Sequence, residues 1–292
     1  MNKRWLLNGA LALLLIALSV IALNETGDQT PKVILKLTPL SATQVTHITI
    51  VRPTFTDVNV QRKGERWEVI RTPIAPGQAS APVPGNAFRI DSLARLAQAD
   101  SILQLHPNSA GLTQYGLAPS PVTVRLNNID IAFGGTDPIK GLRYVLVGDT
   151  VHAVADDQFS QAMAGFHEFV GTELMPDQPM IQTLKLPNLT VTRTTSGAWK
   201  AEPQPVDYSA DAVTRLVDEW RYARALSVGP RDAGPPQGQV TIDFKDGGRM
   251  NFDIATFTPQ LLLVSNTLGL TYTFTADVGE RLFDLSKHRL SE

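Results

Sequence analysis

A helix-forming segment occurs twice in this chain, and this repetition constrains the fold more than any other feature. The segment at 88–96 reads FRIDSLARL and the segment at 208–216 reads YSADAVTRL, a spacing of 120 residues. Each copy continues with apolar residues three and four positions apart, the pattern of one buried helix face. In each copy an Asp stands four residues before an Arg, the favourable order for a surface ion pair. The helix recurs, so we expect the domain around it to recur.

Matching strand patterns flank the two helices. Two short strand patterns precede each helix, with a Gly-containing turn and then a Trp, at Trp67 and Trp199. Four strand patterns follow, with hairpin-type turns at Asn127-Asn128 and Asp246-Gly247. A short terminal helix closes each copy. The alternating residues of the first following strand correspond between the copies: Val122, Val124 and Leu126 in the first, and Val240, Ile242 and Phe244 in the second.

These patterns predict an α+β fold. We expect an N-terminal transmembrane helix followed by two tandem repeats of a mostly antiparallel sheet, each with one main helix and a short terminal helix. The predicted domains are a membrane anchor or signal peptide at residues 1–23, a tether at 24–41, a first repeat at 42–170 and a second repeat at 178–288.

The N-terminus predicts the compartment. Lys3 and Arg4 precede an apolar run from Trp5 to Leu23, whose nineteen residues span roughly 28 Å as a helix, close to the hydrocarbon thickness of a bilayer. Basic residues before the run orient its N-terminus toward the cytoplasm. We expect a single-pass protein of the bacterial inner membrane with its bulk in the periplasm. The alternative is a cleaved signal peptide, with Val20 and Ala22 at the −3 and −1 positions.

Composition narrows the classes of function. The formal charge is −2, so no basic field attracts nucleic acid, and we expect no nucleic-acid partner. Cysteine is absent, which excludes disulfides, thiol nucleophiles and Cys-based zinc sites. With 43% hydrophobic and 18% charged residues the chain belongs with globular rather than disordered proteins.

No catalytic motif stands out in the sequence. The five His residues lack metal-ligand spacing, and no G-x-S-x-G segment is present. The glycine-rich segment at 134–141 follows a strand but lacks the Lys-Ser/Thr of a phosphate loop. His152 corresponds to Tyr272 in the second copy, so we expect it to fill an aromatic-sized position in a sheet. We therefore predict no enzyme activity, no cofactor and no metal site.

One helix end is a candidate interaction surface. The segment at 219–226 reads EWRYARAL and combines Trp, Tyr and Arg, the residue types enriched at interface hot spots. The alternative is a purely structural one, in which this segment is the end of a helix with one aromatic side chain in the core. The predicted partner interface consists of Trp220, Arg221, Tyr222 and Arg224.

A segment of the first repeat resembles a known bacterial family, domain of unknown function 4340. The resemblance covers about residues 43–164, is weaker over the second repeat, and includes Trp67 and the helix at Asp91. The family pattern is a YGL-x-x-P approach to a strand, a Gly-containing strand end, and a YV-x-V strand before a V-x-x-V strand. Its residues here are Tyr115, Gly116, Leu117, Pro119, Gly134, Tyr144, Val145, Val147, Val151 and Val154.

The resemblance implies a membrane-anchored extracytoplasmic protein associated with an ABC-type export system of the kind linked to gliding-motility auxiliary components. The chain has no nucleotide-binding motif, so ATP hydrolysis would belong to another subunit. We therefore expect a non-enzymatic scaffold or accessory protein, with subunits of an ABC-type transporter as partners. The alternative is a periplasmic ligand-binding module that holds a glycan, lipid or peptide in the groove between the repeats.

Overall fold

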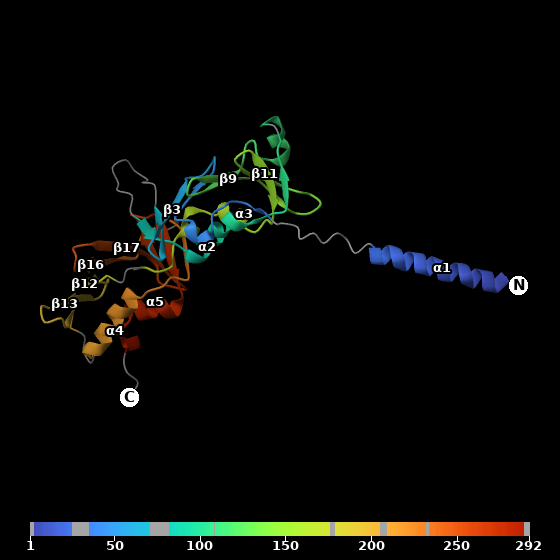
Figure 1. The fold of residues 1–292 in the computed structure, drawn as a ribbon. Helices are drawn as coiled ribbons and strands as arrows, with labels where there is room; N and C mark the ends of the chain where they lie inside the picture. Colours follow the sequence, from blue (N-terminus) through green and yellow to red (C-terminus); the bar gives the residue numbers. More distant parts are fainter. Residues whose placement is uncertain are drawn as a thin grey trace. The chain divides into compact units, whose positions relative to one another are not determined.

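The computed structural model describes residues 3–24, 35–70, 82–107, 109–175, 179–204, 209–231 and 234–288 (Figure 1). Most of the predicted tether, most of the Pro- and Gly-rich loop before the first repeated helix, and Tyr208 lie outside the described residues. The chain divides into two compact units, residues 1–35 and residues 36–292.

The first unit contains α1 (Lys3–Asn24), a helix of 22 residues. Within the described part of the chain, no helix reaches the length and hydropathy required to cross a membrane.

The second unit contains two large antiparallel sheets. Nine strands form the first, in the order β5-β4-β3-β2-β8-β9-β10-β11-β7, and eight form the second, in the order β14-β13-β12-β16-β17-β18-β19-β15. A further pair joins β1 (Leu35–Lys36) to β6 (Asp100–Ser101). The strands of the first sheet are β2 (His47–Val51), β3 (Val58–Lys63), β4 (Arg66–Ile70), β5 (Pro82–Pro84), β7 (Leu103–Leu105), β8 (Val122–Leu126), β9 (Ile129–Thr136), β10 (Arg143–Val147) and β11 (Thr150–Val154). Those of the second are β12 (Ile181–Lys185), β13 (Thr190–Arg193), β14 (Trp199–Glu202), β15 (Ser227–Pro230), β16 (Gly238–Phe244), β17 (Arg249–Thr256), β18 (Leu261–Ser265) and β19 (Leu270–Phe274).

The two sheets have the same strand order once β5 is set aside. Strands β8 and β16, which carry the matched alternating residues, each lie beside the first long strand of their repeat, β2 or β12. The register also agrees further along. His152 lies opposite Val145, and Tyr272 lies opposite Leu263, in the corresponding hairpins. The predicted α+β architecture with mostly antiparallel sheets is therefore confirmed.

The sequence patterns missed two corresponding strands in each repeat, and in the first repeat they also missed β5 and the short pair of β1 and β6. The Trp-containing strands β4 and β14 follow so closely on a Gly turn that they look like its continuation. The edge strands β7 and β15 are three and four residues long, and β15 contains the Gly and Pro that usually signal a turn. Short edge strands gain their hydrogen bonds from a neighbour far away in sequence, which local patterns do not reveal.

The repeated helices are α2 (Ala87–Ala94) and α4 (Ala210–Arg221), with N-caps at Asn86 and Ser209. The two N-caps are 123 residues apart, whereas the matching sequence segments at 88–96 and 208–216 are 120 residues apart. A shift of three residues is close to one helical turn, so it preserves the apolar stripe while moving the matched Asp residues out of register. Asp91 accepts a hydrogen bond from Trp67 Nε1 at 2.8 Å, whereas Asp211 is exposed in the first turn of α4.

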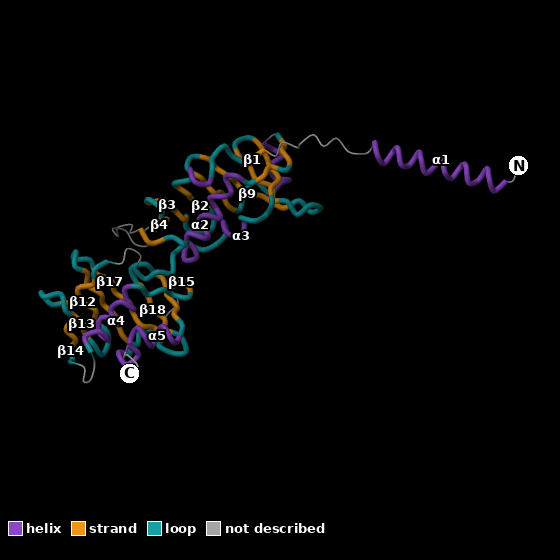
Figure 2. The backbone as a smooth tube through the Cα atoms, turned by 60° about the horizontal axis from the view of Figure 1, so that its bottom comes forward, coloured by secondary structure: helices purple, strands orange, loops and turns teal. Residues whose placement is uncertain are grey.

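Each main helix packs against the sheet of its own repeat and beside a short terminal helix, α3 (Phe159–Ala162) or α5 (Ala276–Phe283). Figures 1 and 2 show α4 and α5 side by side. Their buried faces, together with alternate strand residues, form the hydrophobic core. The core residues of α4 are Ala212, Val213, Leu216, Val217 and Trp220.

The YGL segment has a structural explanation. Gly116 has a φ of +67°, and a Cβ added there would lie 2.8 Å from the backbone nitrogen of Gly135. Gly134 in β9 faces the carbonyl oxygen of Tyr115, and a Cβ there would lie 2.8 Å from Leu117 Cγ. The two glycines let the segment pack directly on the β9 backbone, as expected where two backbones approach closely.

We predict that Gly134→Ala destabilises the protein by about 1–3 kcal/mol, because the added methyl group overpacks this contact. Gly229→Ala is the matched control, since β15 leaves open space around Gly229. Urea unfolding monitored by tryptophan fluorescence measures both variants. Equal stability of the two variants would contradict the close-approach explanation.

Candidate functional site between the two repeats

The segment at 170–175 connects the repeats and is hydrogen-bonded to both. On one side, the N–H of Gly171 donates to the carbonyl of Pro84 at 2.7 Å. On the other side, the N–H of Leu174 donates to Ala223 at 3.0 Å, and the N–H of Ala225 donates to Thr172 at 2.8 Å. Leu174 itself is buried in the core. The connector is thus an ordered part of residues 36–292 rather than a flexible linker between two independent domains.

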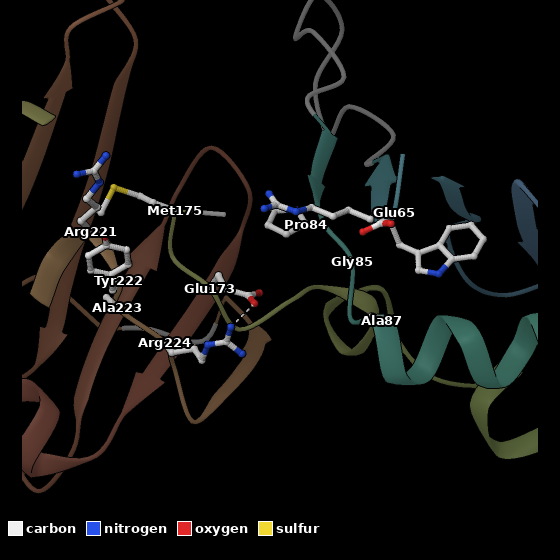
Figure 3. Close-up of a pocket in the computed structure, with 12 residues that line it drawn as sticks. Glu65, Pro84, Gly85, Ala87, Glu173, Met175, Arg221, Tyr222, Ala223 and Arg224 are labelled. Atoms are coloured by element: carbon white, nitrogen blue, oxygen red, sulfur yellow. Dashed lines mark ion pairs between the residues drawn. The ribbon is translucent and has the colours of Figure 1, made fainter. Parts of the chain in front are cut away.

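A pocket of about 410 Å³ lies beside the connector and is lined by both repeats (Figure 3). One wall comes from the start of β4 and the residues that lead into α2, and the other from the connector and the end of α4. The lining residues are Glu65, Arg66, Trp67, Pro84, Gly85, Ala87, Glu173, Met175, Arg221, Tyr222, Ala223 and Arg224.

The pocket combines charged groups of both signs with apolar residues. Three arginines and two glutamates line it, a net excess of one positive charge. Arg224 Nη2 forms an ion pair with Glu173 Oε1 at 2.7 Å (Figure 3), and both side chains are partly exposed. Exposed pairs of this kind contribute at most about 1 kcal/mol, so a carboxylate of a bound molecule can compete for Arg224.

The structure brings three of the four predicted interface residues to this pocket. Tyr222 is 56% exposed, and the guanidinium of Arg221 lies 5.8 Å from the centre of its ring. Arg224 follows on the same wall. These residues stand at the end of α4, off its apolar stripe, and line the pocket.

Trp220 does not belong to this surface. Its side chain is 0% exposed, and its indole Nε1 donates to the carbonyl of Leu282 at 2.6 Å. Its ring also packs edge-on against Phe283 with a centroid distance of 5.4 Å. The prediction of Trp220 as a partner-interface residue is corrected here, because a Trp on the apolar stripe of α4 anchors the helix to α5 instead.

No pattern in the sequence indicated the residues of the opposite wall of the pocket. Glu65 and Arg66 read as an ordinary hairpin between β3 and β4, and Pro84 to Ala87 as the approach to a helix. They lie more than 130 residues from Arg221 in sequence, and the fold brings both segments to one pocket.

The best histidine candidate of the sequence lies elsewhere, in the first sheet. His152 Nδ1 and Ser101 Oγ are 2.8 Å apart, and both residues are buried. The corresponding residues of the second repeat follow from a shared backbone hydrogen bond. Ile102 N donates to Ala153 O in the first repeat, and Leu226 N donates to Thr273 O in the second. The preceding residue on each side of this bond is Ser101 or His152 in the first repeat, and Ala225 or Tyr272 in the second. One repeat therefore fills this place with a Ser–His pair and the other with an Ala–Tyr pair, which favours a packing role for His152.

Burial lowers the pKa of His152, and the nearby His106 lowers it further. In the second repeat, burial raises the pKa of Tyr272 to about 12, so that side chain stays neutral at all physiological pH values. Both shifts reflect the cost of placing a charge at this buried position.

No established family model matches the chain, and no characterised protein or solved structure is significantly similar to it. Among the described residues, no group of three or more His, Asp or Glu side chains is placed to hold a metal ion.

We predict that His152 makes stability depend on pH. The pKa of His152 is lower in the folded state than in the unfolded state. The contribution of the neutral side chain to the free energy of unfolding is therefore complete above about pH 6.5, the ordinary His pKa, and is lost as the pH falls through the lowered value. The variant Ser101→Ala/His152→Tyr has the residues of the second repeat at these positions. Its urea midpoint of unfolding should change less between pH 8 and pH 5 than that of the unsubstituted protein. Identical pH profiles for the two proteins would contradict this role.

Proposed function

We propose that this protein is a non-enzymatic, membrane-anchored scaffold of the bacterial periplasm that holds a partner protein at the pocket between its repeats. The observation that carries the proposal is the position of Arg221, Tyr222 and Arg224 on one wall of that pocket. Tyr and Arg provide much of the binding energy in many protein interfaces. The ordered connector holds the two walls in place before a partner arrives, which reduces the entropy cost of binding.

Two features support the membrane anchor. Lys3 and Arg4 stand ahead of the apolar run, and the run is helical in α1. Seven large apolar side chains between Leu11 and Val20 are 52–70% exposed, a surface that a lipid environment would cover. We infer a single pass through the inner membrane, with residues 36–292 on the periplasmic side.

The proposed partner is a subunit of an ABC-type export complex. Support comes from the resemblance to the domain of unknown function 4340 family, which covers the segment around Tyr115. The glycines of that segment serve packing on β9 rather than binding, so they support a shared fold and not a shared reaction. The site that contacts the partner would then be the pocket.

A second candidate function is binding of a small ligand in the same pocket. The volume of about 410 Å³ falls within the range of small-molecule sites, roughly 300–1,000 Å³. Its arginines suit a ligand with a carboxylate or a phosphate. Native mass spectrometry of the protein purified from membranes separates the two functions, because a scaffold carries a protein subunit and a binding module carries a small molecule.

We predict that Arg221→Glu/Arg224→Glu reduces co-purification of the partner at least tenfold. Reversed charges at an interface cost several kcal/mol, whereas exposed substitutions usually change stability by less than about 0.5 kcal/mol. The measurement is quantitative mass spectrometry of affinity-purified complexes from solubilised membranes, with thermal unfolding to verify the fold.

The matched control is Arg125→Glu/Arg231→Glu, which makes the same change in net charge at exposed residues that do not line the pocket. It should leave the partner bound. Equal partner recovery with both double variants would reject the pocket as the docking site.

We also predict that alkaline phosphatase fused after Glu292 is active and sediments with membranes. This enzyme is active only outside the cytoplasm, so activity reports the side on which the C-terminus lies. An inactive fusion would contradict the proposed topology, and an active but soluble fusion would indicate a cleaved signal peptide instead of an anchor.

A further inference from the structure

The two sheets differ at one edge. In the first, strand β5 pairs with the outer side of β4. In the second, the corresponding strand β14 ends the sheet, and no described strand pairs with its outer side. An open strand edge presents backbone N–H and C=O groups that can pair with another chain.

A shared cross-strand contact shows that β4 and β14 correspond. Arg62 lies opposite Trp67 in β3 and β4, with its guanidinium 4.3 Å from the ring centre. Arg193 lies opposite Trp199 in β13 and β14, at 5.7 Å. Trp199 therefore occupies the place of Trp67, and Ala201 the place of Val69.

The hydrogen-bond pattern shows which backbone groups of the edge point outward. Gly85 N donates to Trp67 O at 2.7 Å, so the backbone N–H and C=O groups of Trp67 point toward β5. The same holds for Val69, which is two residues further along the strand. In the second repeat Thr194 N donates to Ala198 O at 2.8 Å, so the backbone groups of Ala198 and Lys200 point toward β13. By the same alternation, Trp199 and Ala201 direct their N–H and C=O groups away from the sheet.

The first repeat shows how such an edge is closed. Val83, the central residue of β5, lies opposite Val69 and is buried in the core. Pro82 and Pro84 take the positions whose backbone nitrogens face outward, where the missing N–H prevents further pairing. The second repeat lacks this proline-bearing strand among its described residues.

A pocket of about 520 Å³ runs along β14 and provides space for side chains of an added strand. A residue placed opposite Ala201 would point to the same side of the sheet as Ala201, toward Val213 of α4. Lys200 and Glu202 are exposed on the other face, where they pair with each other at 2.5 Å. The edge therefore offers one apolar position between two opposite charges.

We propose that β14 binds an extended segment of a partner protein as an added antiparallel strand, in the position that β5 occupies on β4. The fitting segment has a β-branched apolar residue opposite Ala201. It has a basic residue before it, opposite Glu202, and an acidic or polar residue after it, opposite Lys200. Main-chain hydrogen bonds give such a strand its affinity, and the alternate side chains give its specificity. This edge does not line the pocket between the repeats, so the inference stands independently of the proposed function.

The absence of cysteine allows a register-specific test on the full-length chain in detergent. Lys200 faces β13, so its position forms a non-hydrogen-bonded pair with an added strand, with a Cα–Cα distance of about 4.5 Å. This distance suits a disulfide. The probes are two isomeric peptides, acetyl-TKVCT-amide and acetyl-TKVTC-amide, equilibrated with the Lys200→Cys protein in a thiol redox buffer.

We expect the first peptide, which places its cysteine opposite position 200, to form at least tenfold more mixed disulfide than the second. Ala201→Pro should abolish this preference, because it removes an outward N–H and leaves the bonds to β13 intact. Ala201→Val is the matched control and should retain the preference.

Equal yields from the two peptides would overturn the proposal even if Ala201→Pro fails to fold. A preference that persists in a folded Ala201→Pro protein would overturn it as well. Light scattering of the chain without a cysteine provides a further check: a dimer that Ala201→Pro dissociates would show that a second copy occupies the edge instead of a partner segment.

Discussion

The hydrogen bonds that tie residues 170–175 to both repeats are the interaction on which the arrangement of the candidate site depends. They tie the end of α4 and the residues that lead into α2 to one short segment within residues 36–292. Pro84 on one side, and Ala223 and Ala225 on the other, bond the same short segment. Backbone hydrogen bonds therefore position the two walls of the pocket, and the side chains on those walls line it.

The two large sheets share one strand order apart from β5, and the differences between them are confined to particular positions. The Ser101–His152 pair and its counterpart, Ala225 and Tyr272, fill one position with different chemistry and the same burial. The two sheet edges differ more deeply, because one carries β5 and the other ends at β14. A substitution that keeps the core filled is a packing change, whereas a change at an edge alters what the surface can bind.

Much of the fold follows from local patterns. Alternation predicted the strands around Val122 and Val240, and the apolar stripe predicted α4, because these elements bury one face against a core of their own repeat. The 120-residue spacing of the helices was three residues away from the spacing of their N-caps. A stripe that returns every three or four residues cannot distinguish registers one turn apart, so only the capping residues in the structure resolved it.

The sequence by itself determined the α+β class, the duplication and the residue types at the end of α4. Tertiary structure alone decided that Trp220 is buried against α5, while Arg221, Tyr222 and Arg224 line one pocket with Glu65 and Arg66. The reason is physical: periodicity reports which face of one element avoids water, and so it identifies a core. A site built by two distant segments depends on how their backbones are joined. Here the connector at 170–175 makes that junction through backbone hydrogen bonds, which the periodicity of side chains does not report.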